Sequence, residues 1–82
     1  MDWDDELDAR GLLCPLPVLR ARRRLEAMPP GQVLRLIADD PAAAVDVPHF
    51  CAEAGHLLVD RHDLGAPLHA WIIRRRGAAV GG

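Results

Sequence analysis

The chemistry available to this chain is limited by which reactive side chains it contains. The sequence has no serine, threonine, lysine or tyrosine, so it offers neither a hydroxyl nucleophile nor a lysine for a Schiff base. Besides carboxylates and histidines, only two cysteines remain. Cys14 opens the motif Cys14-Pro15-Leu16-Pro17, whereas Cys51 lies within the apolar stretch "PHFCAEA". The candidate nucleophiles are therefore two thiols.

The motif around Cys14 resembles the start of a helix. Proline is favoured at the first helical position, because its φ angle is already set and its missing N–H would be unpaired there. This predicts Cys14 at the N-cap and Pro17 at the third position, with the N–H groups of Leu16 and Val18 left free. A helix N-terminus lowers a cysteine pKa, in known cases from 8.5 to roughly 3.5–7.5. We expect an exposed, activated thiol at Cys14; the alternative is a small buried apolar residue.

Hydrophobic periodicity and turn residues predict six elements around this motif. Pro48 should break a helix interior, so we expect a short helical turn followed by a second helix that is capped by Asp46 and ends before Gly55. In order, the predicted elements are a strand at Glu6–Arg10, a helix at Pro15–Met28, a strand at Gln32–Ala38, a helical turn at Ala42–Val45 with its restart to Ala54, and strands at His56–Arg61 and Leu68–Arg76.

This β-α-β-α-β-β order predicts an α/β (α+β) two-layer sandwich, in which both helices cover one face of a four-stranded mixed sheet. We expect one domain over residues 1–76, followed by a mobile Gly/Ala tail at 77–82. In helix one, the core stripe should be Val18, Ala21, Leu25 and Met28, at spacings of three and four.

Composition excludes several classes of function. The 82 residues carry a net charge of −2, which argues against a nucleic-acid binder, and the arginines at 74–76 should alternate between strand faces. No apolar run reaches the roughly 18–20 residues that span a bilayer. The acidic start "MDWDDELD" has no apolar segment typical of a secretory signal. We expect a cytoplasmic monomer with no membrane association.

Five blocks follow one another in the sequence: Asp8-Ala9-Arg10-Gly11-Leu12, Cys14-Pro15-x-Pro17, Ala38-Asp39-Asp40-Pro41, Asp46-Val47-Pro48-x-Phe50-Cys51 and Gly55-His56. With these blocks in this order, the chain from Leu7 to about Val59 resembles the TusA/SirA-like sulfur-carrier family. The resemblance implies the same two-layer sandwich and a persulfide carried on Cys14. It implies a carrier with no other cofactor, rather than an enzyme that turns over a substrate alone. Implied donors are cysteine desulfurases or rhodaneses, and implied acceptors serve tRNA thiolation, molybdenum cofactor synthesis or sulfur oxidation.

Residues near Cys14 are candidates for support and docking. Arg10 precedes the cysteine loop and could steady a negative sulfur, with a plain surface arginine as the alternative. Leu16 and Leu19 share a helix face turned away from the core stripe, which predicts an apolar docking surface. Arg20 and Arg23 adjoin that face and could steer partners of opposite charge.

Three other hypotheses compete with this one. Cys51 could be a resolving partner for Cys14 in a thiol-disulfide or regulatory module, although a buried core thiol is favoured. A metal site at His49, Cys51 and His56 is disfavoured, because side chains two apart on a helix diverge by about 200°. The terminal Gly81-Gly82 resembles thiocarboxylate carriers, but those folds begin with a β-hairpin, whereas this one is predicted last.

Overall fold

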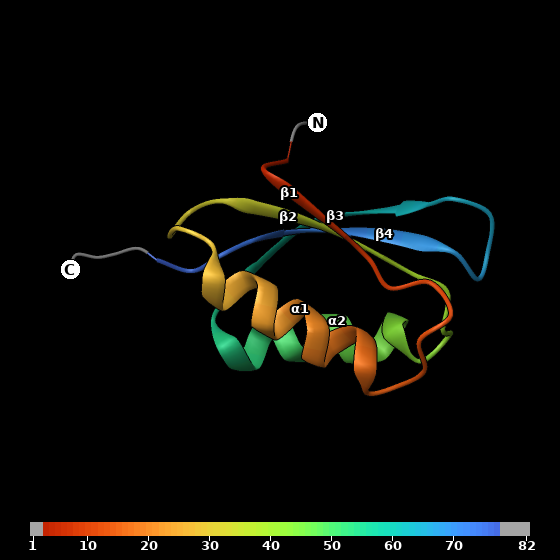
Figure 1. Cartoon of the computed structure of the whole chain (residues 1–82). Helices are drawn as coiled ribbons and strands as arrows, with labels where there is room; N and C mark the ends of the chain where they lie inside the picture. The colour runs from red at the N-terminus through yellow and green to blue at the C-terminus, as the bar shows by residue number, and fades with distance from the viewer. Residues whose placement is uncertain (1–2, 78–82) are drawn as a thin grey trace.

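Buried and partly exposed side chains alternate along the strand Val33–Ala38 (β2), and this pattern shows which face of the sheet is covered. Leu34, Leu36 and Ala38 are fully buried, while the residues between them are partly exposed. Strand side chains point to opposite faces in turn, so the three buried residues share one face. In this computed structural model both helices pack on a single face of the sheet (Figure 1). The expected two-layer sandwich is confirmed.

The six elements follow the expected order. The structure describes residues 3–77. Its elements are β1 (Asp5–Asp8), α1 (Leu16–Ala27), β2 (Val33–Ala38), α2 (Ala43–Ala54), β3 (Leu57–Asp63) and β4 (His69–Arg74). All six lie within the domain predicted over 1–76. Most of the predicted mobile tail, including Gly81-Gly82, lies outside the described residues.

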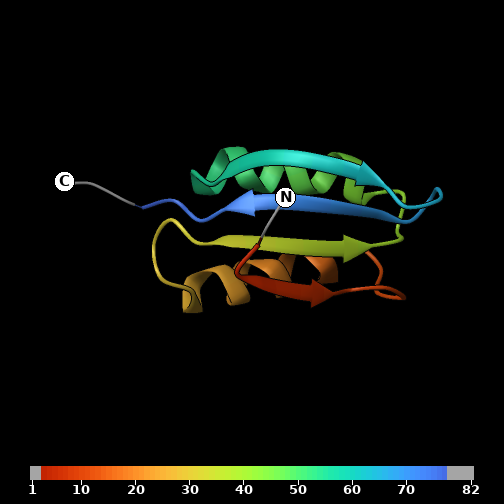
Figure 2. The same ribbon diagram turned by 90° about the horizontal axis from the view of Figure 1, so that it is seen from above.

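The sheet is mixed, with strand order β1-β2-β4-β3 (Figure 2). β1 runs parallel to β2, and the β2–β4 and β3–β4 pairs are antiparallel. β1 and β2 are joined through α1, as a parallel pair requires a crossover connection. Because the two strands are parallel, the loop after β1 and the loop after β2 emerge at the same edge of the sheet. That edge positions Cys14.

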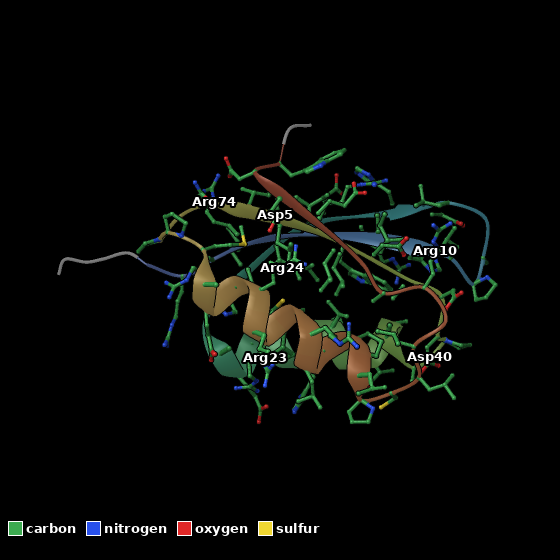
Figure 3. All side chains as sticks on the ribbon, viewed as in Figure 1. Asp5, Arg10, Arg23, Arg24, Asp40 and Arg74 are labelled. Atoms are coloured by element: carbon green, nitrogen blue, oxygen red, sulfur yellow. The ribbon has the colours of Figure 1, made fainter. Side chains whose placement is uncertain are left out.

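The α1 helix packs on the sheet through the apolar stripe predicted from the spacing of its residues. Ala21, Leu25 and Met28 are buried, and Val18 is partly buried against the same core. The helix ends before Pro29, Pro30 and Gly31, where two prolines and a glycine at φ 83° prevent its continuation. An ion pair from Arg24 Nη1 to Asp5 Oδ2, 2.9 Å long, links α1 to β1 (Figure 3).

The prediction for α2 was wrong in one respect. Instead of a turn, a break and a restart capped by Asp46, one continuous helix runs through Pro48. Proline removes one backbone hydrogen bond, but Val47 and Cys51 on either side of it are buried in the core. Their burial against the sheet offsets that loss. The predicted stop at Gly55 is confirmed, since this residue takes the left-handed conformation at φ 81°.

The predicted and observed strand boundaries differ by at most two residues. β1 ends at Asp8 rather than Arg10, although the Ala9 N–H still donates to the Ile37 carbonyl at 2.8 Å. β3 extends to Asp63, because Asp63 pairs with His69 of β4. Among the described residues, no helix is long and apolar enough to cross a membrane.

Candidate functional site

Cys14 and Cys51 occupy opposite environments. Cys14 is exposed in the loop between β1 and α1, and Cys51 is 2% exposed within the core on α2. Both are free thiols. Burial raises the pKa of Cys51 to about 11, so it is inert at neutral pH. The predicted exposure of Cys14 and burial of Cys51 are confirmed.

Two aspartates of the β2–α2 loop hold the loop that carries Cys14. The Cys14 N–H donates to Asp40 Oδ2 at 2.6 Å, and the Gly11 N–H donates to Asp39 Oδ1 at 3.0 Å. Asp40 also accepts from the Ala42 N–H at 3.1 Å, just before α2 begins. Figure 3 shows Asp40 beside the N-terminal end of α1. One carboxylate therefore joins the cysteine loop to the turn that begins the second helix.

The Cys14 side chain is bonded to a third aspartate. Its Sγ–H donates to Asp46 Oδ2 at 2.8 Å, from the first turn of α2. This hydrogen bond raises the pKa of the Cys14 thiol, and desolvation and the charges of Asp46 and Asp40 act in the same direction. The expectation of a lowered pKa was wrong. Asp46 stabilises the protonated thiol by accepting its S–H, and both carboxylates oppose a negative charge on the sulfur.

The helix terminus itself also differs from the prediction. Pro15, not Cys14, is the N-cap, and Leu16 is the first helical residue, so Pro17 is the second. The Leu16 N–H donates to the Leu13 carbonyl at 2.8 Å and is not free for an anion. Cys14 therefore lies one residue before the cap, with its sulfur bonded to α2 rather than to the N-terminus of α1.

A surface hollow of about 180 Å³ lies beside Cys14, between the two helices. Its lining residues are Cys14, Pro15, Val18, Arg22, Asp46, His49, Phe50 and Glu53. The Arg22 guanidinium lies over the Phe50 ring, 5.2 Å from its centroid, as in a cation–π contact. The thiol thus opens onto a partly apolar surface with charged groups at its rim.

Arg10 is occupied elsewhere. Its guanidinium donates to both carboxylate oxygens of Asp8, with an Nη2–Oδ2 distance of 2.8 Å. This pair lowers the pKa of Asp8 and raises that of Arg10. Figure 3 shows Arg10 at the same end of the molecule as Asp40. The structure gives it a carboxylate partner, while support of the Cys14 sulfur stays a prediction.

Comparison with known proteins identifies the family. The sequence model of the family described as Sulfurtransferase TusA matches residues 5–75. The chain belongs to the TusA family. Over 68 residues it is 47% identical to the sulfur carrier protein TusA of Allochromatium vinosum. This match covers 83% of this chain and 90% of that protein. The expected resemblance is confirmed.

A solved structure supports the fold. A SirA-like protein from Desulfitobacterium hafniense matches with a TM-score of 0.77 and 21% identity, over 90% of this chain and all of that one. At this identity the likeness concerns the fold, which is the four-stranded sheet with two helices.

Exposed apolar side chains surround the TusA-family cysteine. Leu16 and Leu19 are 43% and 48% exposed, as predicted for a face turned from the core. Leu13 and Val45, which the sequence pattern did not single out, are 69% and 72% exposed. Leu13 and Leu16 flank Cys14 in sequence, and Val45 precedes Asp46. We call Leu13, Leu16, Leu19 and Val45 the apolar rim.

The two predicted steering arginines are exposed on α1. Figure 3 shows Arg23 on the side of the helix away from the sheet. Arg20 and Arg23 form no ion pair with any of residues 3–77. Their position is therefore open to a partner, and their docking role stays a prediction.

Asp39, Asp40 and Asp46 are the site residues that the sequence analysis missed as neighbours of Cys14. Asp46 was expected only as a helix cap, because aspartate before a helix is common for that reason. The available signal was the predicted order of elements. If β1 and β2 pair in parallel across a helix, the residues that follow them meet at one edge of the sheet. At this TusA-family site that edge brings Asp39 and Asp40 to the cysteine loop, and the first turn of α2 brings Asp46 to the sulfur.

Among residues 3–77, no group of three potential metal ligands is gathered in one place. His49 contacts Glu53 at 3.5 Å, while His56 accepts a hydrogen bond from the Arg76 N–H at 3.0 Å. The arrangement at Cys14 is instead that of a thiol with an adjacent base. Such a pair can exchange a proton while the sulfur forms or breaks a bond.

Proposed function

We propose that Cys14 accepts sulfane sulfur as a persulfide from a donor protein and passes it to an acceptor protein. The observation that carries this proposal is the exposed Cys14 thiol beside a hollow, in a TusA-family chain whose other thiol is buried. A cysteine desulfurase or a rhodanese is the proposed donor. The acceptor would belong to tRNA thiolation, molybdenum cofactor synthesis or sulfur oxidation.

The transfer balances as a thiol exchange. The Cys14 sulfur attacks the outer sulfur of the donor persulfide, and the donor's S–S bond breaks as a new S–S bond forms on Cys14. The donor leaves as a thiolate and takes up one proton. No net oxidation occurs, because one persulfide and one thiol give one persulfide and one thiol. Delivery to an acceptor thiol repeats the step in the other direction.

Asp46 is the proposed base for this exchange. Its Oδ2 already accepts the Cys14 S–H, so the proton can move to the carboxylate as the sulfur attacks and then to the leaving thiolate. The raised pKa of Cys14 keeps the resting thiol protonated. Since the thiolate is the form that oxidises, this also protects an exposed cysteine between transfers.

Loading with sulfur tests the proposal. After incubation with a cysteine desulfurase and cysteine, the intact mass should rise by one sulfur atom. The Cys14→Ser variant should not gain this mass, whereas the matched Cys51→Ser variant should. The opposite result, with sulfur on the Cys14→Ser protein and none on Cys51→Ser, would move the carrier role to the other thiol.

A further inference from the structure

A second hollow, of about 210 Å³, lies near the C-terminal ends of both helices. Its lining residues are Arg22, Glu26, Ala54, His56, Arg75 and Arg76. They come from α1, from the end of α2 and from the segment after β4. The sulfur-carrier function uses none of them except Arg22, which also borders the hollow beside Cys14.

The hollow has an excess of positive charge. Arg22, Arg75 and Arg76 face one carboxylate, that of Glu26. Within residues 3–77 none of these three arginines forms an ion pair, whereas Arg24 and Arg35 each have a carboxylate partner elsewhere. A guanidinium without a carboxylate keeps its capacity to bind an anion.

Arg75 is held in place by the backbone. Its Nε donates to the Leu25 carbonyl at 2.6 Å and its Nη1 to the Arg76 carbonyl at 2.9 Å. The first bond satisfies a carbonyl near the end of α1, which is a structural role in itself. These bonds leave Nη2 available and fix the plane of the guanidinium. Arg22 and Arg76 have no such backbone role in the described contacts.

His56 adds a neutral donor to the hollow. Its Nδ1 accepts the Arg76 N–H at 3.0 Å, so in the neutral ring the proton is on Nε2. Burial lowers the pKa of His56, and the charges of Arg76, Arg75 and Arg22 lower it further against the weaker effect of Glu26. The imidazole thus experiences the positive potential of the three arginines.

We propose that this hollow is a binding site for an inorganic oxyanion of the phosphate or sulfate type. Guanidinium groups bind such anions through paired N–H donors that match two oxygens. The site is distinct from Cys14, because Cys14 does not line this hollow. Along α1, Glu26 lies ten residues beyond Leu16, the first helical residue, which is about 15 Å at 1.5 Å per residue. An anion bound in this hollow is therefore not the sulfur donor of Cys14.

Titration with phosphate tests the site. At constant ionic strength, phosphate should shift the His56 and Arg76 amide resonances along a saturable curve with a midpoint in the millimolar range, and chloride should not. Phosphate should also raise the pKa of His56, because a bound anion stabilises the imidazolium. A linear, unsaturated response, or the same response to chloride, would overturn the proposal.

Substitutions locate the site. Arg76→Gln should weaken phosphate binding at least about tenfold, whereas Arg74→Gln should leave it unchanged. Arg74 is the matched control, since it is exposed at the end of β4 and does not line the hollow (Figure 3). If Arg76→Gln fails to fold, Arg22→Gln should show the same loss. Unchanged binding in the folded variant of either arginine would overturn the assignment.

A third titration distinguishes a free ion from an acidic protein segment. Sulfate should compete with phosphate at the same resonances, while a short glutamate peptide should not displace it at equal concentration. A saturable shift caused by the peptide, together with no saturable shift by phosphate, would overturn the oxyanion proposal and identify a docking site for carboxylates. Loading of Cys14 with sulfur is measured separately, so either result is independent of the proposed carrier function.

Discussion

At the scale of single residues, the feature that matters most is the contact between Cys14 and Asp46. Cysteine beside a proline at a helix start indicates an activated thiolate, but the side chain is bonded to a carboxylate at 2.8 Å. The carboxylate accepts the S–H and opposes a negative charge on sulfur, so it stabilises the protonated form. The resting reactivity of Cys14 is therefore set by a residue 32 positions away in sequence.

Replacing Asp46 tests this control of reactivity. Asp46→Asn removes the negative charge, so the pKa of Cys14 should fall and more thiolate should be present at a given pH. The pH profile of iodoacetamide alkylation should shift to lower pH. Glu53→Gln is the control, since Glu53 lines the same hollow without a bond to the sulfur. An unchanged profile for Asp46→Asn, or one shifted upward, would contradict the assignment.

The charge state of His56 gives a second prediction at this scale. Its pKa is lower in the folded protein than its ordinary value of 6.5, so below about that pH the unfolded chain binds more protons than the folded one. Stability should therefore fall as the pH drops below 6.5. Urea unfolding at pH 7 and pH 5 measures this loss.

A His56→Gln variant should lose less stability between these two pH values than the unchanged protein. His49→Gln, on an exposed side of α2, is the control and should keep the full loss. If His56→Gln keeps the same dependence on pH, another group is responsible.

At the scale of elements, the parallel pairing of β1 and β2 builds the site. It places Cys14, Asp39 and Asp40 at one edge of the sheet, and the start of α2 then brings Asp46 to the sulfur. α1 contributes its exposed leucines to the apolar rim. A persulfide must be shielded from water and from other thiols during transfer, and apolar contacts with a partner around the sulfur would achieve this.

Leu19 tests the docking role of the apolar rim. Because its side chain is 48% exposed, Leu19→Asp should leave the melting temperature nearly unchanged. It should slow sulfur transfer from a loaded donor by at least about tenfold, or roughly 1.4 kcal/mol. The same change at Leu57, which is 56% exposed at the start of β3, is the control and should not slow transfer. Lost stability with intact transfer would assign Leu19 to the core.

The two helices also decide between a carrier and a redox module. Cys51 lies on the buried face of α2, within the core. An intramolecular disulfide with Cys14 would therefore require the helix to leave the sheet. Mild oxidation of the monomer should therefore consume Cys14 and leave Cys51 reduced. The measurement is thiol counting by mass after alkylation, with a non-reducing gel. Good yield of an internal Cys14–Cys51 disulfide would favour the redox module.

At the scale of the whole molecule, the two ends of the helix layer differ. Both helices begin at one end of the layer and end at the other (Figure 1). Cys14 and three aspartates lie at the first end, and Arg75 and Arg76 line the hollow near the second. Acidic residues at helix starts and basic residues at helix ends both complement the helix dipoles. The carrier chemistry proposed here uses the acidic end, and the proposed oxyanion site uses the basic end.

Much of this architecture follows from local signals in the sequence. Proline and glycine end both helices because they restrict or free the backbone at one position, and alternation along β2 follows from the strand period alone. The absence of other nucleophiles leaves Cys14 and Cys51, and their flanking residues separate an exposed thiol from a buried one. These signals act over a few residues, so they can be interpreted without knowing the fold.

Tertiary structure decided what those signals could not. Pro48 lies inside a continuous α2 because burial of Val47 and Cys51 against the sheet offsets one lost hydrogen bond, which no local rule weighs. The pKa of Cys14 rises because strand pairing and helix packing bring Asp46 and Asp40 to it. Distant contacts of this kind depend on which segments meet in space. The residue types fixed which chemistry was available, and packing decided which charges surround it.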